Sequence, residues 1–262
     1  MINSKNTFDV KSIQIKIDKA WLVVVVLLMS SSILIAQKNN EFEIKSPDST
    51  ISLYVTAGTK LQWSFQHKAK RIITPSAISL QLEDGEALGD NAEIISSNTI
   101  KIDNIITPLN YKKAKITDKC NQLTINFKDD YGVIFRVYND AVAYRFFTNR
   151  NGEVIIKNEE ANFNFTDDHK AFIPYMWDYR GNKIFNNSFE ALYRETTISQ
   201  FAKDSLAFLP LLVDVGSNKK VVILEADLED YPGMFLNVNE TQKGFMGVFA
   251  AYPLETMLGG YE

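Results

Sequence analysis

Residues 61–66 read LQWSFQ, and in this stretch large apolar side chains alternate without a fault with polar ones. Residues 78–83 (ISLQLE) and 123–128 (LTINFK) repeat the pattern. Because successive side chains of a β-strand point to opposite faces of its sheet, each stretch predicts a strand with one row of side chains in a core and the other in water. That arrangement is typical of antiparallel sheets, which can have one wet face.

The segments that connect these stretches have the length and composition of turns. Residues 57–60 (AGTK) and 129–132 (DDYG) are two such connections, rich in the Gly and Asp that turns favour. We find no convincing helical stretch after residue 36. Two irregular stretches, 84–104 and 174–201, are predicted to be long loops. Many short strands at close spacing predict an all-β fold, namely a large antiparallel β-sandwich.

Composition narrows the class of function. The chain has 262 residues, 45% of them hydrophobic and 12% aromatic, which is ample for a packed core. Its net charge is −4, and no cluster of Lys and Arg stands out, which argues against a nucleic-acid partner. Cys120 is the single cysteine, so a disulfide within the chain and a cysteine-based zinc site are both excluded.

The first 36 residues have the parts of a secretory signal. Residues 21–36 (WLVVVVLLMSSSILIA) form an apolar run with lysines before it, a small residue at its end and a polar stretch after it. A membrane-spanning helix needs about 20 apolar residues, and this run is shorter. We therefore predict a signal peptide over 1–36 and no stable membrane span, with an uncleaved anchor as the alternative. Residues 37–262 would then be one domain, exported to the periplasm or the cell exterior.

Several sequence blocks resemble, in order, the N-terminal domain of glycoside hydrolase family 97. The strongest is IFRVYNDAVAYRF at 134–146. The others are TPLNYKK at 107–113, NQLTI at 121–125, DHKAFIP at 168–174, LYRET at 192–196 and EADLEDYPGM at 225–234. Each block alone is weak, but together they cover almost the whole chain after residue 46.

This resemblance implies a calcium-dependent exported α-glycosidase, an α-glucosidase or α-galactosidase, in three parts. They are a super-sandwich like that of galactose mutarotase, a (β/α)₈ barrel and a small C-terminal β domain. The barrel would follow residue 262. Glycoside hydrolysis needs two carboxyl groups that face each other across the scissile bond, and this chain offers no convincing pair. We therefore expect the catalytic carboxylates in the barrel, and this chain by itself to leave its oligosaccharide or α-glycoside substrate uncleaved.

The resemblance also implies a calcium ligand. The segment 189–196 (FEALYRET) is similar to the stretch from which the family's sandwich offers one glutamate to calcium, the other protein ligands coming from the barrel. Glu190 holds that position. Glu195 is the substitute, because residues 175–188 depart from the family's pattern and leave the register open. Calcium takes about six to eight oxygen ligands, so one carboxylate from a neighbouring domain is chemically sensible. A solvated loop glutamate is the alternative.

Three further residues are candidate substrate contacts. Glu225 follows the apolar run 221–224 and can either point into a sugar cleft or cap a turn through backbone N–H groups. Trp177 and Tyr193 can stack on sugar faces, although packing in a core or against the barrel is the commoner role for such aromatics.

Two other functions stay open. A free-standing carbohydrate-binding sandwich would need no barrel. An aldose epimerase would use His67 and His169, the only two histidines, as acid–base groups at a sugar ring. For His169, a hydrogen-bonded loop histidine is the simpler explanation.

Overall fold

The computed structural model describes residues 40–251 except 177–184, 186–188 and 230. The predicted signal peptide and Trp177 lie outside the described residues. In the described part, every regular element is a β-strand apart from one short 3₁₀ helix. No helix there has the length and apolar character needed to cross a membrane. The prediction of an all-β fold is confirmed.

The elements follow one another along the chain as a series of short and medium strands. They are β1 (Glu41–Lys45), β2 (Ile51–Ala57), β3 (Leu61–His67), β4 (Lys70–Leu82), β5 (Ala87–Leu88), β6 (Ile94–Ile106), β7 (Ile116–Phe127), β8 (Tyr131–Val137), β9 (Val142–Thr148), β10 (Ile156–Asn164), β11 (Lys170–Ile173), β12 (Arg194–Thr197), η2 (Ile198–Gln200), β13 (Leu211–Gly216), β14 (Lys219–Ile223), β15 (Met234–Val238) and β16 (Gly244–Phe249).

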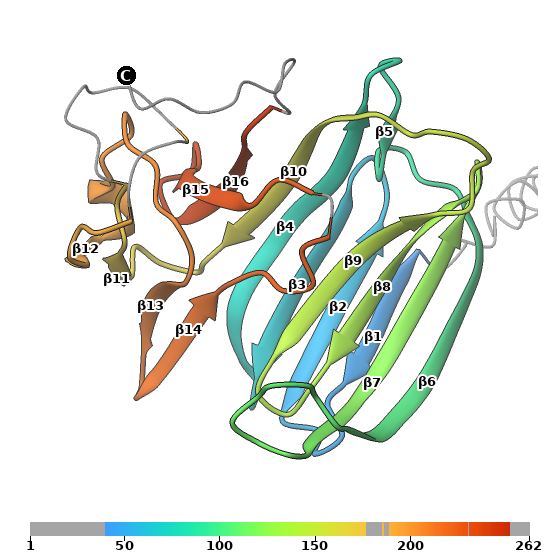
Figure 1. The fold of residues 1–262 in the computed structure, drawn as a ribbon, viewed down its shortest axis with the longest axis horizontal. Coiled ribbons are helices and arrows are strands. Elements are labelled where there is room, and N and C mark those ends of the chain that lie inside the picture. The colour runs from blue at the N-terminus through green and yellow to red at the C-terminus, as the bar shows by residue number, and fades with distance from the viewer. Residues whose placement is uncertain (1–39, 177–184, 186–188, 230, 252–262) are drawn as a thin grey trace, which may run out of the picture. The chain divides into compact units, whose positions relative to one another are not determined.

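The strands form three antiparallel sheets (Figure 1). The largest has the order β1-β2-β3-β4-β10-β16-β15, with β5 added beside β4. A second sheet has the order β6-β7-β8-β9 and lies over the β1–β4 part of the first. The third has the order β12-β11-β13-β14 and lies toward the β15–β16 end. The first two sheets make the predicted sandwich.

Alternating side chains of the two facing sheets fill the core. Leu53 and Val55 of β2 are fully buried, as are Val133, Phe135 and Val137 of β8. The residues between them are partly exposed, so each strand has the one-sided pattern that its sequence predicts. Burial of this apolar surface is the main stabilising contribution to the fold.

The stretch 61–66 lies in β3, at the centre of this arrangement. The ring of Trp63 lies 6.1 Å from that of Tyr144 in β9 and 6.0 Å from that of Phe163 in β10 (centroid distances). The contact with Tyr144 joins the two facing sheets across the core, whereas Phe163 belongs to the same sheet as Trp63. Tilted or edge-on aromatic pairs of this kind add to what area burial alone contributes.

The predicted loop at 84–104 is wrong. This part of the chain contains β5 and most of β6, and β6 pairs with β7 from Ile94 to Ile106. Strand β6 lies at the edge of its sheet, and only Ile94 in it is buried. Because neither face of the strand needs to be apolar, its sequence lacks the alternation on which the sequence-based prediction depends.

The third sheet joins the sandwich through β15 and β16. The backbone N–H of Ala207 donates to Leu236 O at 2.9 Å, and the N–H of Leu236 donates to Ala207 O at 2.8 Å. Phe201, just after η2, places its ring 6.0 Å from that of Phe245 in β16. The second predicted loop, 174–201, is therefore only partly a loop, since it contains β12 and η2.

Candidate functional site

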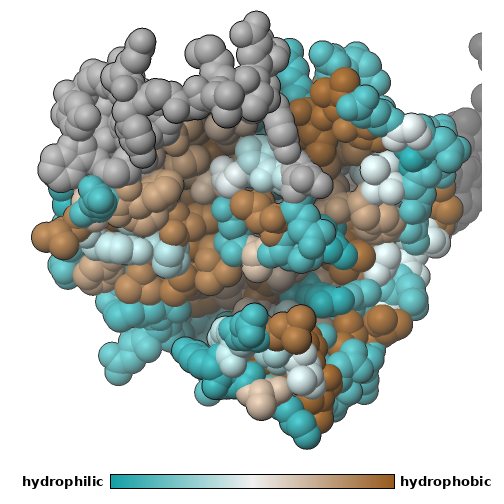
Figure 2. Space-filling model, viewed as in Figure 1, coloured by the Kyte–Doolittle hydropathy of each residue, from teal (hydrophilic) through white to brown (hydrophobic). Residues whose placement is uncertain are grey.

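An exposed cluster of aromatic and aliphatic side chains lies beside the third sheet. We call it the aromatic face and define it as Phe189, Leu192, Tyr193, Phe208 and Phe235. The ring of Phe189 lies 4.9 Å from that of Phe208 and 6.4 Å from that of Phe235. Phe189 is 57% exposed, Tyr193 48% and Leu192 92%. Figure 2 shows apolar surface on the side of the domain that carries the third sheet.

Glu190 is exposed and lies between Phe189 and Leu192 of the aromatic face in the sequence. Its substitute Glu195 is part of β12 and forms an ion pair with Lys170, Nζ to Oε1 2.6 Å. Within the described residues, no group of three or more His, Cys, Asp or Glu side chains could hold a metal ion. Any metal bound at Glu190 would need its remaining ligands from elsewhere.

Tyr193 is fixed at its polar end. Its hydroxyl donates to the backbone oxygen of Pro210 at 2.8 Å, and its ring meets that of Phe208 edge-on at 6.4 Å. The ring is still about half exposed, so one side of it is open to a partner.

Glu225 makes the turn-capping contact that is one of its two predicted roles. Both carboxylate oxygens accept the backbone N–H of Met234, at 3.1 and 3.0 Å. Burial raises the pKa of Glu225 above its usual value, and the hydrogen bond from Met234 opposes part of that rise. The carboxylate therefore fastens the turn that leads into β15. Its contact with a sugar stays a prediction.

A second carboxylate nearby was missed by the sequence reasoning. Glu159 of β10 accepts a hydrogen bond from the Tyr231 hydroxyl at 2.8 Å and a longer one from the Tyr144 hydroxyl at 3.4 Å. Burial is the main cause that raises the pKa of Glu159, and the charge of Glu225 adds to it. Burial likewise raises the pKa values of both tyrosines, so their hydroxyls stay neutral donors.

One signal in the sequence could have identified Glu159. It shares a strand face with Ala161 and Phe163, the first of which is fully buried. A glutamate in register with core side chains is a buried charge that needs partners. Neither tyrosine partner could have been identified from spacing, since one comes from β9 and the other from the segment before β15.

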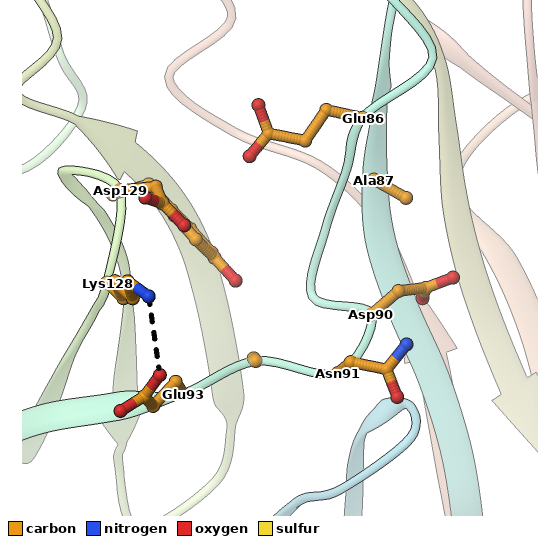
Figure 3. A pocket seen from close by; sticks show the side chains of 9 residues that line it. Glu86, Ala87, Asp90, Asn91, Glu93, Lys128 and Asp129 are labelled. Carbon is orange, nitrogen blue, oxygen red and sulfur yellow. Dashed lines mark ion pairs between the residues drawn. The ribbon is translucent and has the colours of Figure 1, made fainter.

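A hollow of about 400 Å³ opens near the loops around β5 and the β7–β8 turn (Figure 3). Its lining is acidic, and three of its four carboxylates, all except Asp129, have cation partners among the described residues. Glu86 pairs with Arg150 at 2.6 Å, Asp90 with Lys60 at 2.9 Å and Glu93 with Lys128 at 3.8 Å. In Figure 3 the Asp90 carboxylate also points away from the Glu86 side of the hollow. The hollow is therefore a charged surface in which most carboxylates are paired. Asp90 Oδ1 is buried without a hydrogen-bond partner among the described residues, but the described lining residues include no group of three or more side chains that could hold a metal ion.

The two histidines have separate surroundings. His67 ends β3, and burial together with nearby Lys219 lowers its pKa. His169 lies with its ring edge-on to Phe165 at 5.9 Å and with Nε2 3.4 Å from the Thr166 hydroxyl, and burial lowers its pKa too. His169 thus has the local contacts expected of a loop histidine.

Comparisons with known proteins agree on one family. The family model described as "Glycosyl-hydrolase 97 N-terminal" matches residues 44–253. A retaining alpha-galactosidase of Bacteroides thetaiotaomicron is 35% identical over 230 residues, which is 86% of this chain and 34% of that protein. The chain thus spans about a third of the length of this relative.

Solved structures show the same fold. One is a glycoside hydrolase family 97 enzyme in complex with acarbose from Pseudoalteromonas sp. strain K8, with a TM-score of 0.66 and 20% identity, covering 79% of this chain and 32% of that one. Another is a beta-arabinopyranosidase, with a TM-score of 0.70 and 23% identity, covering 80% of this chain and 35% of that one.

Proposed function

The chain belongs to glycoside hydrolase family 97, whose N-terminal domain it carries, and from this membership we propose that it forms the non-catalytic wall of the active site of an exported α-glycosidase. The observation that carries the proposal is the aromatic face, with Glu190 between two of its residues in the sequence. An exposed group of large apolar side chains around a carboxylate is what a domain needs if it is to dock beside a sugar site and contribute one polar ligand.

The proposed occupant of the aromatic face is the enzyme's own (β/α)₈ barrel. Phe189, Leu192 and Tyr193 expose large apolar surface that a docked domain would cover. Surface of this kind is depleted on free-standing soluble domains and enriched at interfaces. The rigid third sheet beneath it would fix the position of the face relative to the sandwich.

We propose calcium as the cofactor and Glu190 as the ligand that this domain supplies. Glu190 rather than Glu195 is favoured because Lys170 neutralises Glu195, whereas Glu190 has no cation among its described neighbours. Calcium prefers carboxylate and carbonyl oxygens and takes about six to eight of them. One exposed carboxylate fits as a single member of a shell completed by the barrel. When bound, calcium would supply positive charge beside the sugar.

We propose that the reaction takes place in a barrel domain of the enzyme. A retaining glycosidase needs two carboxyl groups about 5–5.5 Å apart on either side of the scissile bond. In this domain the charge of Glu225 acts on Glu159, but each carboxylate already accepts a hydrogen bond. Glu159 accepts from the Tyr231 hydroxyl, and Glu225 accepts from the backbone N–H of Met234. Neither is free to attack or protonate a sugar. We therefore propose an oligosaccharide or α-glycoside as the substrate of the whole enzyme, with galactose favoured by the relative's activity.

The test compares the 262-residue protein with the product of its reading frame extended past residue 262. Both are assayed on aryl α-galactosides and aryl α-glucosides, with and without a calcium chelator. We expect no turnover by the short protein and chelator-sensitive turnover by the long one. Hydrolysis by the short protein would overturn the proposal. A stop codon directly after Glu262 would instead favour a free-standing carbohydrate-binding module.

A further inference from the structure

The segment between β14 and β15 crosses from the third sheet to the largest sheet. We call residues 224–229 and 231–233 the bridge segment. Its side chains are largely exposed, among them Leu224 and Leu228. The described part of the bridge segment contains no strand or helix, so its position depends on side-chain contacts.

Three polar contacts hold the described part of the bridge segment. Asp227 pairs with Arg145 of β9 at 3.2 Å, but the two side chains are 68% and 66% exposed, and exposed pairs contribute little because water and salt screen them. Glu225 accepts the N–H of Met234, which closes the segment on itself and not on the sandwich. The third contact, between Tyr231 and Glu159, is partly buried and reaches the sandwich.

The Tyr231–Glu159 contact reaches from the bridge segment into the sandwich. Tyr231 donates to Glu159 at 2.8 Å, and its ring packs edge-on against Phe249 of β16 at 6.0 Å. Tyr144 of β9 approaches the other oxygen of Glu159 at 3.4 Å. One carboxylate on β10 therefore joins β9, β10 and the bridge segment. A hydrogen bond to a buried charged acceptor is stronger than one between exposed neutral groups.

From these contacts we infer that Glu159 is a positioning residue, which through Tyr231 fixes the bridge segment and the start of β15 on the sandwich. β15 begins at Met234, and its next residue, Phe235, carries the ring against which Phe189 packs. The line of contacts from Glu159 thus ends beside Glu190. This last step rests on the proposed function; the anchoring of the bridge segment does not.

The alternative is that Glu159 is one more core residue, with no special effect on the bridge segment. The neighbouring Glu160 allows the two to be distinguished. It belongs to the same strand, but it contacts Lys60 at 3.2 Å and accepts from Ser79 at 3.0 Å, away from Tyr231. Glu160→Gln is therefore a matched control for Glu159→Gln.

The experiment measures hydrogen–deuterium exchange of backbone amides in the 262-residue protein and needs neither sugar nor calcium, so its failure would leave the proposed function untouched. Tyr231→Phe removes only the hydroxyl. We expect it, and Glu159→Ala, to speed exchange in peptides covering 224–235 by about tenfold or more. Peptides covering β3 and β4 should keep their protection in Tyr231→Phe.

A conservative substitution of Glu159 distinguishes a positioning role from a general role in packing. Glu159→Gln keeps an oxygen that can accept from Tyr231, so we expect exchange of the bridge segment to stay within about twofold of the unmodified protein. Glu160→Gln should leave it unchanged. Unaltered exchange in Tyr231→Phe would overturn the inference, as would an equal increase in the β3 and β4 peptides. If Glu159→Ala unfolds the domain, Tyr231→Phe still tests the inference. This variant loses the hydroxyl that donates to Glu159 but keeps the aromatic ring that packs against Phe249.

Discussion

The sandwich core and the aromatic face contain the same kinds of side chain, but these are buried in the core and exposed on the aromatic face. Phe135 of β8 is fully buried between the two facing sheets, whereas Phe189 beside the third sheet is 57% exposed. The first is satisfied by contacts within the domain. The second makes aromatic contacts on one side only and leaves the other side to water. The contrast indicates that the core determines stability, and it supports the proposal that the aromatic face binds a partner.

The largest expected effect on stability comes from a substitution in the sandwich core. Phe135→Ala removes a fully buried ring and leaves a cavity, which should lower the free energy of unfolding by about 3–5 kcal/mol. Phe189→Ala, the matched change on the aromatic face, should cost no more than about 1.5 kcal/mol, the worth of an aromatic pair. Urea unfolding followed by tryptophan fluorescence measures both. Equal losses would contradict the division between core and face.

A smaller effect is expected from pH at Glu159. Its folded-state pKa is raised, mainly by burial, so it favours the folded state at pH values below its unfolded pKa, and this contribution is lost as pH rises through the folded pKa. The unfolding free energy should therefore fall with rising pH more steeply in the unmodified protein than in Glu159→Gln. Urea unfolding at a series of pH values checks this.

The control for the pH series is again Glu160→Gln. The groups that face Glu159 are Tyr144, Tyr231 and Glu225, and the tyrosines stay neutral because their pKa values are raised. Glu225 also has a raised pKa and is present in every variant. Because its charge acts on Glu159, the difference measured in Glu159→Gln includes the repulsion between the two carboxylates. A pH dependence of Glu159→Gln that is the same as that of Glu160→Gln would refute the assignment to Glu159.

The smallest effect on stability is expected from a substitution on the aromatic face. Leu192→Ser should change the free energy of unfolding by about 0.5 kcal/mol or less, because Leu192 is 92% exposed. The same change should reduce binding of a hydrophobic dye such as ANS. Dye binding that is unaltered would show that the aromatic face is not the main exposed apolar surface.

The sequence predicted those parts of the fold in which one face of a strand is buried. The alternation at 61–66 and 123–128 corresponds to β3 and to the end of β7, because there the core demands an apolar side chain at every second position. It failed at β6, an edge strand with only Ile94 buried. An exposed edge imposes no such burial pattern, and the strand signal that remains is the many isoleucines of residues 94–106.

The site was less predictable than the fold. Glu190 was proposed through the family resemblance and not from its spacing. Glu225 was predicted as a substrate contact with a turn cap as the alternative; the structure shows the capping contact with Met234, and the sugar contact stays a prediction. Glu159 was missed because its role depends on Tyr144 and Tyr231, which lie on other segments and approach it only in the folded domain.

The most direct test of the proposed wall of the active site is calcium affinity. In the enzyme extended past residue 262, calcium binding is measured by titration calorimetry for the unmodified protein, Glu190→Gln and Glu195→Gln. We predict that Glu190→Gln weakens calcium binding by about tenfold or more, since a metal site loses one charged oxygen ligand. Glu195→Gln should bind as the unmodified protein does, because Lys170 already pairs with Glu195. Unchanged affinity in Glu190→Gln would contradict the account.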